Sequence, residues 1–232
     1  MTASFDPQQY ERLSSGSVPG YAALQDLVAL AAAATGPGSS SRVLDLGCGT
    51  GAGTLALART LPEVQLIACD PAAAMVAAGR SRCETAGVKA HFVVGGLSAV
   101  PDDARFDVVV CTLVLHFIPV EERVAFLTSI RERLRPGGAL ILSVLGRSKD
   151  PAVQAVWTQI RRHHATSQGI TPTELAAREA ETRGKVQPLS SEEVHAALDS
   201  AGFTNAVPLY QLVAVHSWLA RPGSATPESA ES

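Results

Sequence analysis

Alternating glycines after an acidic residue give this chain its clearest chemical signature. An apolar run that begins at Val43 ends at Asp45, and Gly47, Gly49 and Gly51 follow at every second position. Because glycine has no Cβ, such a loop can turn sharply and bring a ligand against the backbone N–H groups at the start of the next helix. The pattern therefore predicts a strand, a ligand-binding loop and a helix.

A second carboxylate closes the next apolar run, VQLIACD. Asp70 follows the glycine loop by roughly twenty residues, the place where a nucleotide-binding domain presents an acid to the ribose hydroxyls of its cofactor. The alternative is that Asp70 caps the helix that begins after Pro71. A nicotinamide cofactor also fits this spacing, so the two acids and the glycines do not identify the ligand by themselves.

Strands and helices alternate along most of the chain. The sequence predicts strands at 42–46, 65–69, 90–94, 106–113 and 140–145, and helices at 21–34, 72–85 and from residue 119 onward. The run FDVVVCTL is apolar throughout, as in strands that are buried on both faces of a parallel sheet. This order predicts an α/β fold with a doubly wound, mostly parallel sheet.

The stretch after the last of these strands breaks the alternation. Residues 147–189 have a helical pattern rich in arginine and histidine, and they predict a helical insert over the ligand-binding end of the sheet. Ser190 or Ser191, with Glu193 placed to complete a capping box, then predicts the start of another helix.

Three further details separate this pattern from nicotinamide-binding domains. Asp45 lies two residues before the first glycine, LRPGG precedes a late apolar run, and SAGF precedes two final runs, 203–209 and 210–219, which predict a closing hairpin. Together these features resemble the class I S-adenosylmethionine (AdoMet) methyltransferases, over residues 17–219. The resemblance implies a doubly wound, mostly parallel seven-stranded sheet with a C-terminal antiparallel hairpin, a helical cap insert, and AdoMet as the cofactor.

The same resemblance divides the chain into segments. They are a polar, partly mobile N-terminal arm (1–18), an AdoMet-binding Rossmann-like core (19–146), a helical lid insert (147–189), a closing helix and hairpin of the core (190–219) and a disordered tail (220–232).

The resemblance also implies which residues would hold the cofactor. Asp45 would meet the amino group, Asp70 both ribose hydroxyls, and Pro71 the adenine ring. The residues implied to line the rest of the cofactor site are Gly47, Cys48, Gly49, Gly51, Gly96, Leu97 and Cys111.

Two positions depart from the family pattern. Gly96 stands where relatives carry an acid for the adenine amino group, so backbone groups near Leu97, or the side chain of Asp102, would have to replace it. Cys111 stands where many relatives carry serine or asparagine, and it is expected, together with Thr112, to face the methyl region.

Methyl transfer from AdoMet is an in-line displacement that requires positioning and exclusion of water, and a base only where the acceptor must lose a proton. His116 follows the strand at 106–113 and is predicted to be such a base, with structural packing as the alternative. Arg161 or Arg178 in the insert is predicted to pair with a carboxylate of the acceptor or of a carboxylated AdoMet, and a solvated polar face is the alternative.

Upstream, SVPGY resembles the entry to the first helix in a subgroup that includes the tRNA wobble-uridine enzymes that use carboxy-AdoMet. Tyr21 then corresponds to the tyrosine at the sulfonium end of the cofactor, with a core aromatic as the alternative. No carboxylate cluster with metal-ligand spacing follows the strands at 106–113 and 140–145, so no metal is expected.

Composition narrows the function further. The 232 residues carry a net charge of −3, which disfavours a broad nucleic-acid footprint, and the four cysteines form no CxxC pair. The longest apolar run, ALQDLVALAAAA, is interrupted by Gln25 and Asp26 and is too short to span a membrane. We expect a cytoplasmic enzyme, in the form of a monomer or homodimer, that methylates oxygen, nitrogen or carbon of a small molecule in specialised metabolism. A carboxy-AdoMet-dependent tRNA wobble-uridine enzyme and a non-catalytic AdoMet-binding partner protein remain the alternatives.

Overall fold

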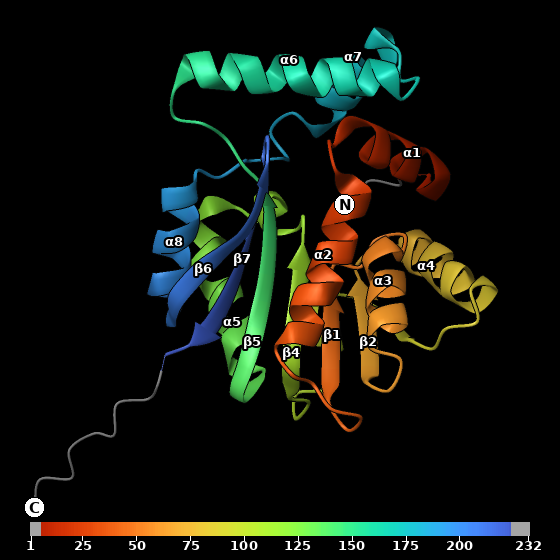
Figure 1. The fold of residues 1–232 in the computed structure, drawn as a ribbon, viewed down its shortest axis with the longest axis vertical. Helices are drawn as coiled ribbons and strands as arrows, with labels where there is room; N and C mark the ends of the chain where they lie inside the picture. Colours follow the sequence, from red (N-terminus) through yellow and green to blue (C-terminus); the bar gives the residue numbers. More distant parts are fainter. Residues whose placement is uncertain (1–5, 224–232) are drawn as a thin grey trace, which may run out of the picture.

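One sheet organises the chain, for which a computed structural model describes residues 6–223. Its strands lie in the order β3-β2-β1-β4-β5-β7-β6 (Figure 1). The strands are β1 (Arg42–Leu46), β2 (Gln65–Asp70), β3 (His91–Val94), β4 (Phe106–Thr112), β5 (Leu134–Leu145), β6 (Phe203–Leu212) and β7 (Val215–Pro222). The first five pair in parallel and β7 pairs antiparallel with both β5 and β6. The predicted fold class is confirmed.

Helices cover both faces of the sheet, and a third group lies across one end of it (Figure 1). One face is covered by α2 (Tyr21–Ala34), α3 (Ala52–Thr60) and α4 (Ala73–Thr85), the other by α5 (Arg123–Glu132) and α8 (Ser191–Ser200). The end group consists of α1 (Pro7–Ser17), α6 (Pro151–Ser167) and α7 (Pro172–Thr182). Three 3₁₀ turns complete the list: η1 (Leu97–Ala99), η2 (Leu115–Phe117) and η3 (Val120–Glu122).

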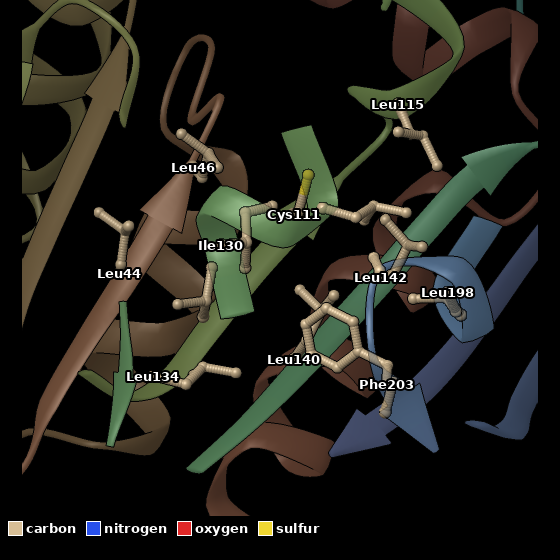
Figure 2. Close-up of a cluster of buried hydrophobic side chains, with 14 of the residues drawn as sticks. Leu44, Leu46, Cys111, Leu115, Ile130, Leu134, Leu140, Leu142, Leu198 and Phe203 are labelled. Atoms are coloured by element: carbon tan, nitrogen blue, oxygen red, sulfur yellow. The ribbon is translucent and has the colours of Figure 1, made fainter. Parts of the chain in front are cut away.

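The core forms on both sides of the central strands because their side chains alternate between the faces. In β5, Leu140 and Leu142 belong to the cluster that contains Phe203 of β6 (Figure 2), whereas Ile141 belongs to the cluster under α2. Cys111 of β4 is fully buried in the first of these clusters. Because helices cover both faces of the sheet, only the ends of its strands remain available for a ligand-binding site.

The predicted hairpin exists, but its turn is elsewhere. The sequence placed the turn after Leu209, whereas β6 continues to Leu212 and the chain reverses at Val213 and Ala214. Neither residue is a usual turn former, and Val213 has φ 53°, a left-handed conformation that β-branched residues rarely adopt. The turn is therefore imposed by strand pairing and could not be read from local residue types.

The N-terminal arm is also different from the prediction. Residues 7–17 form α1, which begins at Pro7 after Asp6, whose carboxylate accepts from the N–H groups of Gln8 and Gln9. Leu13 of α1 packs with Ala165, Ile170 and Leu175, a small apolar cluster shared with the insert. The helix thus belongs to the same cap as α6 and α7, which we call the lid (α1, α6 and α7).

At the other end of the chain, residues 220–222 of the predicted tail belong to β7. The rest of that prediction, residues 224–232, lies outside the described residues.

We expect Gly51→Ala to lower the free energy of unfolding by about 3 kcal/mol. Gly51 has φ 80°, and a Cβ there would lie 2.7 Å from the Cα of Gly79, so the contact between α3 and α4 would have to open. Gly87→Ala is the matched control: φ is 67° but nothing lies within 4 Å of an added Cβ, so about 1 kcal/mol is expected. Urea unfolding measures both, and equal losses would contradict the close approach.

Candidate functional site

A cavity of about 810 Å³ lies between the carboxyl ends of the parallel strands and the lid. This is the switch-point position at which open α/β sheets bind ligands, and the volume is that of a ligand pocket. Its floor is formed by Asp45, Gly47, Cys48, Gly49, Asp70 and Pro71, its wall by residues 112–118 after β4, and its roof by Tyr10, Trp157, Arg161, Arg178, Glu179 and Arg183.

The glycine loop and Asp70 are tied together at the floor. The N–H of Gly49 donates to Asp70 Oδ2 at 3.0 Å and the N–H of Ala72 donates to Oδ1 at 2.8 Å. Burial raises the pKa of Asp70, and these two N–H groups partly offset the rise. Asp70 is not the cap of α4, because the N-cap position is Ala72, so the alternative of a helix cap does not hold.

Asp45 is the most deeply buried acid of the floor. Its Oδ2 accepts from the hydroxyl of Thr54 at 2.6 Å, and the residue is 3% exposed. Burial raises its pKa to about 6, and the nearby negative charge of Asp70 adds to the rise. Gln25 of α2 approaches the same place, since a Cβ on Gly53 would meet Gln25 Oε1 at 2.9 Å and Asp45 Oδ2 at 3.6 Å.

Two tyrosines border the cavity from the α1 and α2 side. Tyr21 lines it at the start of α2, and burial raises the pKa of its hydroxyl, with a further contribution from Tyr10. The guanidinium of Arg178 lies 5.1 Å from the centre of the Tyr10 ring. Tyr21 is therefore a neutral phenol at the cavity, which leaves its predicted place at the sulfonium end as a proposal.

His116 lines the cavity, but its geometry contradicts the predicted role as a base. Its Nδ1 accepts from the N–H of Leu145 at 3.1 Å, so the proton of the neutral ring is on Nε2. Burial, and then the positive charge of Arg123, lower its pKa to about 3. A ring that carries its proton toward the cavity and resists a second one cannot accept a proton from a substrate at neutral pH.

The roof carries most of the positive charge around the cavity. Arg161 pairs with Glu179 across α6 and α7, and both residues line the cavity with Arg178 and Arg183. Arg161 therefore lies at the cavity, but its guanidinium is already paired with Glu179. Its predicted contact with a carboxylate of the acceptor stays a prediction. Arg178 pairs in turn with Glu181 at 3.4 Å. Three arginines with two glutamates leave this end of the cavity with a net positive charge, opposite a floor that is acidic.

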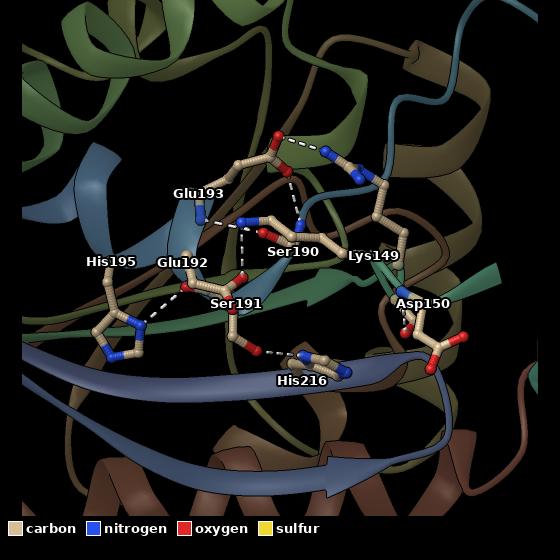
Figure 3. Close-up of polar contacts among 10 residues, drawn as sticks. Lys149, Asp150, Ser190, Ser191, Glu192, Glu193, His195 and His216 are labelled. Carbon is tan, nitrogen blue, oxygen red and sulfur yellow. Dashed lines mark hydrogen bonds and ion pairs between the residues drawn. The ribbon is translucent and has the colours of Figure 1, made fainter. Parts of the chain in front are cut away.

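The lid is attached to the core at a closed base. Where the insert leaves and rejoins the core, the N–H of Arg147 donates to the carbonyl of Leu189 at 2.9 Å. The carboxylate of Glu193 accepts from the N–H of Ser190 at 2.7 Å (Figure 3). The same carboxylate pairs with Arg147. This confirms the predicted capping box of α8, at Ser190.

His216 of β7 packs against Trp157 of α6 and so connects the sheet to the lid. Ser191 Oγ lies 3.2 Å from Nδ1 of His216 (Figure 3), and the His216 ring lies 5.6 Å from that of Trp157 in the lid. Trp157 in turn lines the cavity, so the packing of α6 reaches the site.

Four residues predicted for the cofactor site do not line the cavity. Gly51 begins α3 and donates to the carbonyl of Cys48 at 2.9 Å. Cys111 points into the core cluster (Figure 2), because consecutive strand residues face opposite sides and Thr112 takes the cavity side. Gly96 and Leu97 lie at η1, where Leu97 packs against the same cluster.

The proposed substitute at the adenine end, Asp102, is not in the lining either, since its carboxylate pairs with Arg133 at 2.9 Å. Thr112, which was expected to face the methyl region together with Cys111, does line the cavity, whereas Gln25, Leu113 and Glu179 line it without having been assigned from the sequence. Gln25 could have been recognised from the sequence, because it is a polar residue within the apolar run of the first predicted helix, 21–34. No feature of the sequence marked Leu113 as a lining residue. Its φ of 59° shows that the backbone is strained where the chain enters the cavity wall.

Within residues 6–223, no group of three or more His, Cys, Asp or Glu could hold a metal ion. Over the same residues, no helix has the length and apolar character needed to cross a membrane. All four cysteines are buried and free.

Comparisons with known proteins agree with this architecture. The sequence family described as "Methyltransferase domain" matches residues 43–138. A carboxy-S-adenosyl-L-methionine synthase from Pseudomonas fluorescens (strain SBW25) is 35% identical over 216 residues, which are 89% of this chain and 86% of that protein.

Two solved structures share the fold at low sequence identity. Magnesium protoporphyrin IX methyltransferase (ChlM) from Synechocystis PCC 6803, with bound SAH, superposes with a TM-score of 0.62 at 19% identity, over 88% of this chain and 84% of that one. CalO1, a methyltransferase in calicheamicin biosynthesis in its SAH-bound form, gives 0.60 at 21% identity, over 87% of this chain and 54% of that one.

We expect Asp45→Asn to stabilise the ligand-free protein at pH 7 by about 1–3 kcal/mol. With a folded pKa near 6 instead of 3.8, the folded state holds a proton that the unfolded state has lost, so stability falls as the pH rises through this window. Asparagine keeps an oxygen that accepts from the Thr54 hydroxyl, but it cannot titrate, so the fall in the free energy of unfolding with rising pH is lost. Urea unfolding at pH 4 and pH 7 measures it, with exposed Asp103→Asn as the control. An unchanged pH dependence would show that Asp45 titrates normally.

Proposed function

The chain belongs to the class I S-adenosylmethionine-dependent methyltransferase family, and we propose that it transfers the methyl group of AdoMet to a small anionic acceptor held under the lid. One observation carries the choice of acceptor. One cavity has buried Asp45 and half-buried Asp70 in its floor, and in its roof three arginines that pair with only two glutamates, Glu179 and Glu181. Opposite charges at the two ends suit a cationic donor below and an anionic acceptor above.

The floor fits the charges and the shape of AdoMet. The negative charge of Asp70 adds to the rise in the pKa of Asp45, and burial raises the pKa of both acids, so a bound ammonium or sulfonium would stabilise their charged forms. Each oxygen of Asp70 already accepts one backbone N–H and retains a lone pair, which suits two ribose hydroxyls. Gly47 and Gly49 have φ of 79° and 52°, a conformation that lets a ligand lie against the bare backbone.

AdoMet supplies a methyl group that is already activated on a positive sulfur. The chain's own part is to position the acceptor and to exclude water. We assign positioning to the residues of the wall and roof, and exclusion of water to the lid, which is closed at its base by the Arg147–Leu189 contact. Trp157 offers a flat apolar surface beside the Arg161–Glu179 pair, which suits a planar carboxylate-bearing acceptor.

Synthesis of carboxy-AdoMet is the second candidate, favoured by the relative of that name that is 35% identical over 89% of this chain. An arginine-rich roof could hold the carboxyl group of such a product. Mass spectrometry separates the two: methyl transfer yields S-adenosylhomocysteine (SAH), whereas synthesis yields a product heavier than AdoMet by one CO₂.

The same measurement bears on the two remaining alternatives. Formation of either product would exclude a non-catalytic binding partner. A tRNA-modifying activity would require tRNA binding that weakens steeply with salt, which a chain of net charge −3 does not favour.

Asp70→Ala should weaken AdoMet binding about tenfold or more, because charge-assisted hydrogen bonds to the ribose are lost. Isothermal calorimetry with AdoMet and with SAH measures the change. Asp103→Ala, an exposed acid outside the cavity, is the matched control and should bind normally. Unchanged affinity in Asp70→Ala would mean that the ribose is held elsewhere, and tight NADH binding would refute the cofactor assignment.

Arg161→Ala should reduce kcat/KM for the acceptor about tenfold while SAH affinity stays within twofold, since the roof is proposed to hold the acceptor and not the donor. The neighbouring Arg162 is exposed and does not line the cavity, so Arg162→Ala serves as the control. Steady-state kinetics measures kcat/KM for the acceptor, and calorimetry measures the affinity for SAH. A loss of SAH affinity with unchanged acceptor constants would place Arg161 at the donor instead.

A further inference from the structure

One side of the His116 ring is fixed by a hydrogen bond. Nδ1 faces β5 and accepts from the N–H of Leu145 at 3.1 Å. Nε2 has no hydrogen-bond partner among the described residues and is not sealed from solvent, and His116 lines the cavity. The Nε2–H is therefore the polar group of the neutral ring that is left to meet a ligand in the cavity.

A buried arginine holds the segment that carries this ring. Arg123 of α5 is 6% exposed, and it donates from Nε to the carbonyl of Ile118 at 3.0 Å and from Nη2 to the carbonyl of Gln187 at 2.7 Å. The N–H of Gln187 donates back to the carbonyl of His116 at 2.7 Å. The end of the lid insert and the wall of the cavity are thus one hydrogen-bonded unit.

Charge reinforces this arrangement. Arg123 is the charged group that acts on the His116 ring, and Glu193 and Glu121 act on Arg123 in turn. A cation behind the ring opposes its protonation and favours an anion in front of it. Among the described residues, Arg123 is the charged group that acts on the ring, and no carboxylate hydrogen-bonds to it.

We propose that His116 is a hydrogen-bond donor, whose Nε2–H binds an anionic oxygen of the methyl acceptor. This rests on the proposed methyl transfer and adds to it the ionisation state of the acceptor. In the step, an oxygen lone pair forms the bond to the methyl carbon while the C–S bond breaks and its electron pair stays on sulfur. An acceptor that arrives as a carboxylate, phenolate or enolate has no proton to lose, so no base is required.

This assignment excludes one substrate class. A protonated amine has no lone pair to accept the Nε2–H and would meet the positive field of Arg123 and the arginine roof. Amines and other cationic acceptors should therefore be excluded.

Two substitutions distinguish a donor from a base. Glutamine can accept from Leu145 and donate toward the cavity, so His116→Gln should retain acceptor turnover within about threefold, whereas His116→Leu should lower kcat/KM about tenfold or more. SAH affinity should stay within twofold in both. A base would instead lose about a hundredfold in both variants. That result, or equal turnover in Gln and Leu variants, would overturn the proposal.

A spectroscopic measurement tests the tautomer without any turnover. With ¹⁵N-histidine in the full chain, the signals missing from His116→Gln belong to His116, and they should show the Nε2–H form unchanged from pH 8 to pH 5. In SAH-saturated protein, benzoate, salicylate or 4-hydroxybenzoate should shift the Nε2–H signal, and benzylamine should not. An Nδ1–H form, titration near neutral pH, or no response to any of the three anions would overturn the proposal. Absence of methyl transfer with a responding Nε2–H would instead count against the proposed function.

Discussion

A carboxylate buried at the end of β1 is the constraint on which the site depends. Asp45 is 3% exposed and its pKa is raised to about 6, so at neutral pH the fold keeps a charge where burial opposes it. Its carboxylate accepts a hydrogen bond from the hydroxyl of Thr54. The glycine loop brings Asp70 close without a side chain between them, which increases the repulsion. A floor of this kind gains stability when a cation binds, and that requirement selects the ligand.

The wall and the roof complete a gradient of charge across one cavity. The floor is acidic, His116 in the wall is neutral, and the three arginines of the roof are partly balanced by Glu179 and Glu181. A cationic sulfur and an anionic nucleophile attract each other, so the protein has to hold them at the correct distance and angle more than it has to activate either. Under this division no base is required, since both reactants would arrive in their reactive charge states, and His116, predicted from the sequence to be a base, would serve only to position the acceptor.

Local signals in the sequence were sufficient for the floor. The bounds of β1 and α2 were predicted as they stand, and Asp45, Gly47, Gly49 and Asp70 all reach the cavity, because strand, loop and helix signals lie within a few residues of one another. The side chain of Cys111 was placed on the wrong face, since a shift of one residue along a strand exchanges the faces. For a fully apolar strand, no polar alternation in the sequence shows which residues turn toward the site.

Contacts between distant parts of the chain could not be predicted from local sequence signals. The tautomer of His116 depends on the N–H of Leu145, which belongs to the next strand, and the lid includes α1 only because Leu13 meets Ala165 and Ile170. Local propensity carries no information on either pairing. A polar N-terminal segment therefore resembled a free arm, although its few apolar residues face a partner formed much later in the chain.

The attachment of the lid connects these distant contacts to the chemistry. Glu11 of α1 pairs with Arg82 of α4, and Arg12 pairs with Glu174 of α7, so α1 bridges the core and the insert at the end away from the Arg147–Leu189 base. The bridging pairs are partly exposed and each contributes little, which makes this end of the lid the easier one to open. The base, where backbone hydrogen bonds and buried Arg123 join the insert to the segment of His116, would stay in place. Opening at the α1 side would therefore leave the wall that carries His116 joined to the core.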